Sequence, residues 1–131
     1  RVMAVPIVQP KHPDAAAFMA RALTHASRAE ASGDGNGYGA VIVRDGLIIG
    51  EGWNRIYRNH DPTAHGEIEA IRDASRRTGS RDLSGAVIYA TGGHPCPMCA
   101  TACYWAGLDR IYYGDDPKAI TDAGAPAYDK C

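Results

Sequence analysis

Apolar residues recur at helical spacing in three parts of the chain, and they alternate with polar residues or form short runs in four others. The first helical part follows Asp14, a residue type that often caps the first turn of a helix. The predicted helices run over about 14–31, 63–78 and 96–106. The predicted strands run over 38–44, 47–53, 86–91 and 110–114. The first two strands meet at Asp45-Gly46, a favoured two-residue hairpin turn.

The order of these elements favours one mixed sheet with helices packed on its faces. Residues 115–131 show little periodicity, so we predict a loop there with at most a short helix over about 117–122. At 131 residues the chain has the size of one domain, and we expect a single domain over 1–131. It starts at Arg1 rather than methionine and stops at Cys131, so we expect terminal segments to be missing, the C-terminal one included.

Composition and charge exclude several classes of protein. The hydrophobic fraction of 45% and the charged fraction of 22% are ordinary for a globular protein. A net charge of −1 gives no general basic surface for a nucleic acid, and no apolar run approaches membrane-spanning length. Three of the four cysteines crowd into 96–103, which suits metal or redox chemistry better than disulfides. We therefore expect a cytoplasmic protein without a membrane partner.

Three residues at two predicted helix starts have the chemistry to bind one metal ion. Cys96 and Cys99 are three positions apart and share one face of a first helical turn, where the helix dipole favours thiolate. His65 lies in the first turn of the preceding helix, so two facing helix N-termini would surround a single ion. Three protein ligands leave the fourth tetrahedral position for water, as in catalytic zinc sites. We predict one Zn²⁺ per chain, held by His65, Cys96, Cys99 and a water molecule.

Glu67 follows His65 by two positions, which places the two side chains roughly 200° apart around a regular helix. They cannot share a lateral face, but both can point off the N-terminal end of the helix. Zinc would lower the pKa of its water towards neutrality, and the nearby carboxylate would then move protons. We predict that Glu67 is the catalytic proton shuttle rather than a fourth ligand.

Two alternatives use the same cysteines. A structural zinc site needs a fourth ligand, and Cys103 lies about 6 Å beyond Cys99 along the helix axis, so we predict that Cys103 is a core residue. His94 is nearer and stays open as a ligand. A disulfide or redox role for the Cys-x-x-Cys pair is the second alternative.

The joint occurrence of His65-Gly66-Glu67 and Pro95-Cys96-Pro97-Met98-Cys99 resembles the signature of the zinc-dependent, cytidine deaminase-like superfamily. The segment 61–72, and Tyr104-Trp105-Ala106 after the cysteines, are similar to bacterial guanine deaminases, fungal cytosine deaminases and tRNA adenosine deaminases. The resemblance extends from about residue 39 to residue 114. It implies a three-layer α-β-α sandwich around a mixed five-stranded sheet, usually dimeric.

The resemblance also implies a reaction and a set of contacts to the base. Zinc hydroxide attacks the carbon that bears the amino group, and Glu67 passes protons to the ring nitrogen and to departing ammonia. Asn54 matches an asparagine that hydrogen-bonds the base, with a loop-start residue as the alternative, and the Ala64 N–H is a further expected contact. Tyr38 and Trp105 stand where guanine deaminases have ring-stacking aromatics. Core packing is the alternative for both, and a pocket wall for Tyr38.

Two departures from the family pattern concern the substrate. Relatives carry Glu before Pro-Cys-x-x-Cys, whereas this chain has His94 after two glycines, so we expect a pocket loop of different shape and charge. His94 is a candidate substrate contact, and a surface-loop histidine is the alternative. Guanine deaminases also place an Asp pair after Ala-Gly-Phe, and here Pro126 and Ala127 stand in that region. Asp129 is a candidate for a displaced equivalent of that pair.

We therefore predict a hydrolytic deaminase of a small-molecule heterocyclic base, guanine or cytosine in type, that works as a homodimer. A tRNA adenosine deaminase is the alternative, and near-neutral charge argues against it. Its candidate phosphate contacts are Arg55, Arg58, Arg76, Arg77 and Arg81. A zinc-stabilised binding module is the third possibility, in which Glu67 would have no function.

Overall fold

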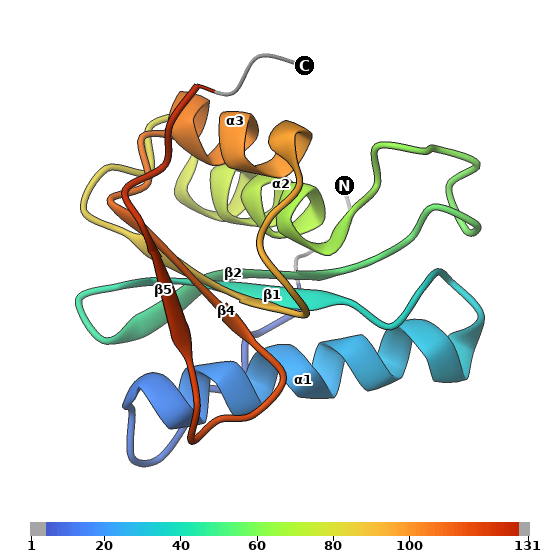
Figure 1. Ribbon diagram of the computed structural model, residues 1–131, viewed down its shortest axis with the longest axis horizontal. Coiled ribbons are helices and arrows are strands. Elements are labelled where there is room, and N and C mark those ends of the chain that lie inside the picture. The colour runs from blue at the N-terminus through green and yellow to red at the C-terminus, as the bar shows by residue number, and fades with distance from the viewer. Residues whose placement is uncertain (1–4, 129–131) are drawn as a thin grey trace.

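In the computed structural model, which describes residues 5–128, a five-stranded sheet separates one helix from two others (Figure 1). The elements in chain order are α1 (Ala15–Ser32), β1 (Gly39–Arg44), β2 (Leu47–Trp53), α2 (Gly66–Thr78), β3 (Val87–Thr91), α3 (Pro97–Ala106), β4 (Arg110–Gly114) and β5 (Thr121–Gly124). The strand order is β2-β1-β3-β4-β5, in which only β3 and β4 are parallel neighbours. Helix α1 covers one face, and α2 and α3 cover the other. The α-β-α sandwich with a mixed five-stranded sheet is confirmed.

Helix α1 is held to the sheet by an apolar layer. The Asp14 carboxylate accepts a hydrogen bond from the Ala17 N–H at 2.7 Å, which confirms the predicted N-cap. Phe18 and Met19 are buried against Val41 and Tyr89 of the sheet. Each such side chain contributes about 1.5–3 kcal/mol when it is fully removed from water. This layer fixes the helix that precedes the strand β1.

Helix α2 approaches the opposite face of β2 unusually closely. A Cβ atom added to Gly50 would lie 2.5 Å from the Cβ of Ala74, and one added to Gly52 would collide with the backbone nitrogen of Ala70. Only glycine leaves room for the helix at these two positions. The close contact fixes where the N-terminal end of α2 lies relative to the sheet.

The outer edge of β2 is covered by side chains rather than by another strand. The Gln9 carboxamide donates to the Ile48 carbonyl at 2.8 Å and accepts from the Ile48 N–H at 2.9 Å. The Asp73 carboxylate accepts from the Glu51 N–H at 3.0 Å. These bonds satisfy backbone groups that an exposed edge would offer to another chain.

The Glu51 side chain takes part in a largely buried ionic contact with α1. One of its oxygens lies 2.6 Å from the Nε2 atom of His25, and the Arg21 Nε–H donates to it at 3.0 Å. Burial by itself would raise the pKa of this carboxyl, but the hydrogen bonds with His25 and Arg21 outweigh burial and lower the pKa to about 2. The carboxylate is therefore ionised throughout the neutral and mildly acidic range.

Both site helices begin later than the sequence pattern predicts. Helix α2 begins at Gly66 rather than near residue 63, because the Asp61 carboxylate accepts hydrogen bonds from the N–H and the hydroxyl of Thr63 and forms a separate turn. Helix α3 begins at Pro97, with Cys96 as its N-cap. The proline occupies the first turn, as predicted.

The prediction for the segment after β4 was wrong in one respect. Thr121–Gly124 forms the strand β5, which pairs antiparallel with β4, where we predicted a loop with at most a short helix over about 117–122. The strand has only four residues, and Thr121 and Asp122 are exposed. The sequence therefore lacks the alternation of apolar and polar residues that would predict a strand there. Among the described residues, no helix is long and apolar enough to cross a membrane.

Candidate metal centre and catalytic site

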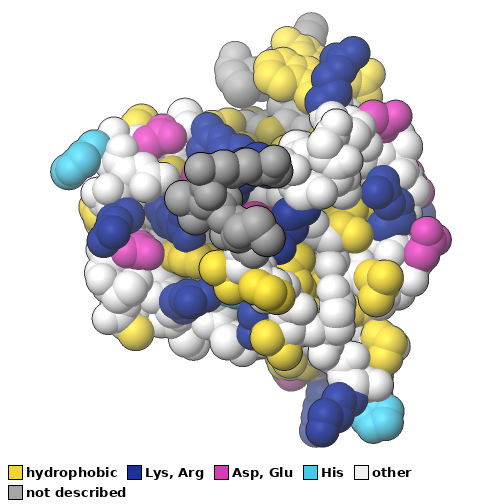
Figure 2. Space-filling model, turned by 180° about the vertical axis from the view of Figure 1, so that it is seen from behind, with side chains coloured by type: hydrophobic (Ala, Val, Ile, Leu, Met, Phe, Trp, Pro, Cys, Tyr) yellow, Lys and Arg dark blue, Asp and Glu magenta, His cyan; other side chains and the backbone are white. Residues whose placement is uncertain are grey.

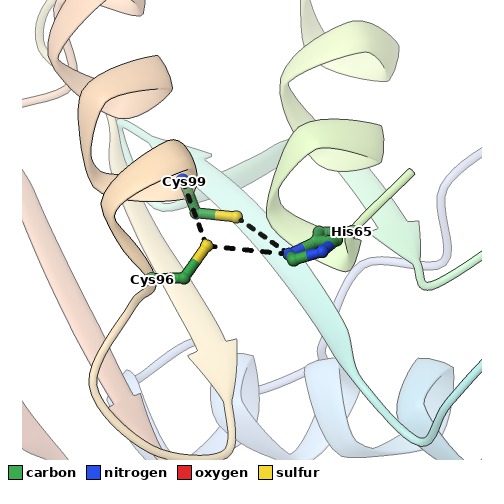
Figure 3. Close-up of side chains that lie close together, drawn as sticks. All are labelled: His65, Cys96 and Cys99. Carbon is green, nitrogen blue, oxygen red and sulfur yellow. Dashed lines mark hydrogen bonds between the residues drawn. The ribbon is translucent and has the colours of Figure 1, made fainter. Parts of the chain in front are cut away.

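The N-terminal ends of α2 and α3 meet at His65, Cys96 and Cys99 (Figure 3). His65 is the N-cap residue of α2, and its Nδ1 atom faces both sulfurs. It lies 3.7 Å from the Sγ of Cys96 and 3.5 Å from the Sγ of Cys99. The Cys99 N–H points to the Cys96 sulfur at 3.4 Å, so Cys96 caps the helix that presents Cys99. The predicted meeting of two helix starts is confirmed.

The donor atoms of these three residues lie within 4.8 Å of one another. Within the described part of the chain, no other three or more His, Cys, Asp or Glu side chains form such a group. Two sulfurs and one imidazole nitrogen are the donor set that zinc prefers, and neither magnesium nor calcium favours it. The residues present fit one Zn²⁺ bound through His65 Nδ1 and the two sulfurs.

The electrostatics of Cys99 differ from the prediction that the helix dipole favours thiolate. Burial raises the pKa of the Cys99 thiol, and the negative charge of Glu67 raises it further. The dipole is outweighed because Cys99 is completely buried, so its thiolate would lose all contact with water. A bound cation supplies the missing compensation, which is a second reason why this donor set fits a metal.

Glu67 lies in the first turn of α2 and is partly buried. Its negative charge is among the causes that raise the pKa of Cys99, and it does not belong to the group of three donors. The role of Glu67 as a proton shuttle stays a prediction. A position outside the group of donors leaves this carboxylate available to exchange protons with a molecule at the metal.

The two candidates for a fourth protein ligand both lie outside this group. Cys103 is buried in the core formed by the sheet, α2 and α3, as predicted. His94 is exposed, its Nδ1 atom lies 3.0 Å from the Pro95 carbonyl, and its ring meets Tyr113 edge-on at 5.6 Å between centroids. The arrangement of the described residues thus gives a structural, four-ligand zinc site no support.

Asn54 directly follows β2 and is buried, with 4% of its surface exposed. Its Oδ1 atom accepts hydrogen bonds from the N–H groups of Asn36 and Ile56, both at 3.2 Å. These two donors determine which end of the amide is the oxygen. The Nδ2 amino group is therefore the end that Asn54 can offer to a base.

Two other predicted substrate contacts lie near this residue. The Tyr38 carbonyl accepts from the Asn54 N–H at 2.9 Å, and the Tyr38 ring is 45% exposed and packs on Gly92. Tyr38 is thus a wall residue of the open space around Gly92, and it does not belong to the core. The Ala64 N–H donates to the Asp61 carbonyl at 3.2 Å and its residue is fully buried, so its contact with a base stays a prediction.

Trp105 lies away from the metal group of its own chain. It lies six positions after Cys99 on α3, about 9 Å along the helix axis, and it is 74% exposed. Core packing, the alternative considered for this residue, is excluded by that exposure. Asp129, the candidate for a displaced acidic contact, lies outside the described residues.

One positioning contact was missed by the sequence pattern. The Trp53 indole N–H donates to the Asp34 carboxylate at 2.9 Å, and the guanidinium groups of Arg55 and Arg28 lie 3.8 and 4.5 Å from the centre of the Trp53 ring. The hydrogen bond joins the loop after α1 to the last residue of β2, directly before Asn54. The position of Trp53 next to Asn54 is the only signal in the sequence that could have indicated this contact.

Comparison with known proteins points to one family. The model of the cytidine and deoxycytidylate deaminase zinc-binding region matches residues 13–115. Guanine deaminase of Bacillus subtilis (strain 168) is 42% identical over 107 residues, which are 82% of this chain and 68% of that protein. A tRNA-specific adenosine deaminase of Agrobacterium fabrum is 44% identical over 102 residues, 77% of this chain and 66% of that protein.

A solved structure gives the same result. The X-ray structure of the guanine deaminase from Bacillus subtilis superposes with a TM-score of 0.69 and 41% identity, covering 76% of this chain and 62% of that chain. The chain therefore spans about two thirds of the length of these relatives.

Proposed function

Because the chain belongs to the family of cytidine and deoxycytidylate deaminases that share a zinc-binding region, we propose that it is a zinc-dependent hydrolytic deaminase of a free nucleobase or a related aminated heterocycle. The observation that carries the proposal is the group His65, Cys96 and Cys99 with the Glu67 carboxylate beside it. Three ligands with an adjacent proton carrier are the requirements of hydrolytic chemistry at a metal. A purely structural site would not require Glu67.

The proposed roles follow from the positions of the side chains. His65 Nδ1 and the sulfurs of Cys96 and Cys99 would hold Zn²⁺. When bound, zinc activates a water molecule as the nucleophile. The Glu67 carboxylate takes the proton that the water loses, delivers it to the ring nitrogen next to the reacting carbon, and passes a proton to the leaving amino group, which departs as ammonia.

Asn54 orients the base in this proposal. Its oxygen is engaged by the backbone N–H groups of Asn36 and Ile56, so its amino group donates to the substrate. The atom of the base that faces Asn54 is therefore an acceptor, a carbonyl oxygen or an unprotonated ring nitrogen. Both kinds of acceptor occur in guanine and in cytosine.

The charge distribution supports a free base over a nucleic acid. Arg76 and Arg77 both pair with Asp73, at 3.5 and 2.8 Å, and Arg55 lies over Trp53. Three of the five arginines considered for phosphate contacts thus have partners within the fold. On the face drawn in Figure 2, basic side chains are scattered among acidic, apolar and uncharged ones rather than gathered in one field. The net charge of −1 agrees with this distribution.

Two further proposals concern the setting of the enzyme. Tyr104 and Trp105 are 52% and 74% exposed on α3, and such neighbouring aromatics on a surface support a homodimer through this helix. Cys96, Cys99 and Cys103 are all free thiols, which supports a reducing compartment, the cytoplasm.

A screen for ammonia release tests the proposed reaction. The zinc-loaded protein is incubated with guanine, cytosine, isocytosine, adenine and aminotriazines, and in parallel with unmodified tRNA. We expect release from at least one free base and no inosine in the tRNA. Inosine formation in tRNA without release from any base would exclude the free-base proposal in favour of a tRNA deaminase.

A further inference from the structure

The Asn54 carboxamide oxygen accepts one hydrogen bond from its own segment and one from a distant segment. The Ile56 N–H, two positions away, closes a local turn, whereas the Asn36 N–H comes from the loop after α1, and both bonds are 3.2 Å long. The local bond forms wherever this turn forms. The distant bond forms only when the loop after α1 lies in the correct place. Whatever holds that loop therefore also holds the Asn54 amide.

Gly35, in the middle of this loop, packs directly on Asn54. A Cβ atom added to Gly35 would collide with both the side-chain oxygen and the main-chain oxygen of Asn54. On its other side the loop touches the end of α1, because the Gly35 N–H donates to the Ala29 carbonyl at 3.4 Å. The contact leaves no room for a side chain between the loop and Asn54, so a shift of the loop would displace the carboxamide.

The Trp53 indole joins this loop to the end of β2. Its N–H donates to the Asp34 carboxylate at 2.9 Å, and this bond is the largest of the causes that lower the pKa of Asp34. The indole ring is itself held in place: it stacks on the buried His25 ring, with 5.4 Å between centroids and 9° between planes, and the Arg55 guanidinium lies 3.8 Å from its centre. A fixed donor thus meets an ionised acceptor, which makes the hydrogen bond a charge-assisted one.

The residues around Asn54 also connect it to the metal group. The Arg55 N–H donates to the Ala64 carbonyl at 2.9 Å. Ala64 directly precedes His65, whose Nδ1 atom faces the two cysteine sulfurs. Displacement of this segment would therefore change where the Asn54 amide lies relative to the proposed metal ligands.

We propose that Trp53 and Asp34 are positioning residues that act on the substrate through Asn54. Their hydrogen bond holds the loop where its N–H meets the Asn54 oxygen, so the amino group is the end presented to the base. Without this bond the carboxamide can turn over and present its oxygen, which repels an acceptor atom of the base. The proposal rests on the proposed deaminase function, because that function assigns Asn54 to the base.

Solvent exchange of the Asn36 N–H tests the positioning without relying on activity. The exchange rate is measured by NMR in the ¹⁵N-labelled, zinc-loaded chain. In Asp34→Ala the main-chain bonds of the loop are retained, because the Asp34 carbonyl accepts from the N–H groups of Tyr57 and Arg58 at 3.1 and 2.9 Å. We expect exchange about tenfold faster in this variant, and nearly wild-type exchange in Asp34→Asn, whose amide oxygen can still accept from the indole. Equal exchange in the wild type and Asp34→Ala would overturn the proposal.

The matched control is Asp82→Ala. The Asp82 carboxylate also accepts a hydrogen bond from a side chain, that of Ser84, and Asp82 is exposed. It lies before the start of β3, whereas the metal ligands follow the end of that strand. The exchange rate of the Asn36 N–H should be unchanged in this control, and an increase equal to that of Asp34→Ala would contradict a specific contact.

Kinetic constants distinguish positioning from a merely structural role. With a base that the ammonia screen identifies, we expect KM to rise about tenfold in Asp34→Ala and in Trp53→Phe, and kcat to stay within about twofold, because the contact with Asn54 is made in the ground state and in the transition state. Loss of folded protein alone would lower kcat and Tm and leave KM unchanged. The two variants remove the same hydrogen bond, so the double variant should have a KM close to that of either single variant. Multiplied effects in the double variant would overturn the proposal.

The two experiments separate this inference from the proposed function. If the wild type deaminates no heterocycle, the proposed function fails, and the exchange of the Asn36 N–H still decides whether the hydrogen bond of Asp34 positions the loop. If the wild type deaminates a base and KM is unchanged in Asp34→Ala, the positioning proposal fails alone.

Discussion

The Nδ1 atom of His65 lies 3.5 Å from the sulfur of Cys99, although 34 positions separate the two residues in the chain. The Cys103 sulfur, only four positions further along α3, takes no part in this group and is buried in the core. The contrast between two buried cysteines of one helix provides a direct test of the metal centre.

We expect Cys99→Ser to reduce the zinc content from about one ion per chain to near zero, because a serine hydroxyl is a poor zinc ligand. Cys103→Ser should keep its zinc and lose only stability, by about 1–3 kcal/mol for a buried hydroxyl without a partner. Zinc is measured by atomic emission after gel filtration. Full zinc content in Cys99→Ser would contradict the assigned ligand set.

Removal of the metal should destabilise the fold, because the ion ties the N-termini of α2 and α3 together. We expect treatment with a strong chelator to lower Tm by several degrees and added zinc to restore it, since about 1 kcal/mol corresponds to roughly 4–8 °C in small domains. Differential scanning calorimetry measures the change. An unchanged Tm after complete zinc removal would show that the ion does not connect the two helices energetically.

Glu67→Gln separates catalysis from metal binding. The amide keeps the shape of the side chain but cannot carry the proton, so we expect ammonia release to fall by about 10²–10⁴-fold. Zinc content and Tm should stay close to those of the wild type, because Glu67 is not one of the three donors. Loss of zinc and of the folded state together would favour a structural metal site.

The buried contact of Glu51 with His25 and Arg21 makes stability depend on acidity. The folded-state pKa of Glu51 is about 2, below the ordinary value of 4.5, so its contribution is complete above pH 4.5 and is lost as the pH falls towards 2. The shift corresponds to about 3 kcal/mol at neutral pH. The free energy of unfolding is measured in urea for the wild type and for Glu51→Gln between pH 7 and pH 3. It should fall more steeply with decreasing pH in the wild type than in the variant. An equal dependence on pH in the two proteins would contradict this assignment.

The proposed homodimer rests on the exposed aromatic residues Tyr104 and Trp105 of α3. We expect Trp105→Ala to shift the protein towards monomer in sedimentation equilibrium, because a large aromatic at the centre of an interface often contributes more than 2 kcal/mol. Tyr57→Ala is the matched control, since Tyr57 is a 59% exposed aromatic on the loop after β2. A wild type that stays monomeric at every concentration would rule out the proposal.

Local signals in the sequence predicted most of the fold and the metal group. The cap at Asp14, the Asp45-Gly46 turn and the spacing of Cys96 and Cys99 each involve residues a few positions apart, and the structure confirms them. The start of α2 was placed three residues early because the turn at Asp61 depends on a side chain that competes with the helix backbone.

The features that were missed depend on contacts between distant segments. Strand β5 exists because β4 offers it a pairing edge, and its own four residues carry no strand pattern. Trp53 meets Asp34 across 19 positions, and the Asn36 N–H meets the Asn54 oxygen across 18 positions. No periodicity within either segment can indicate such meetings.

The glycines at positions 50 and 52 place the backbone of α2 directly on the strand below it. A helix that rests on side chains can shift by a fraction of an ångström when those side chains change rotamer or are replaced. At Gly50 and Gly52 the helix α2 meets the strand without intervening side chains, so we expect rotamer changes elsewhere in the core to displace the imidazole at its first turn less than they would displace a helix held by side chains alone. The metal geometry therefore depends directly on these two glycines, because a side chain at either one would displace the helix that carries His65.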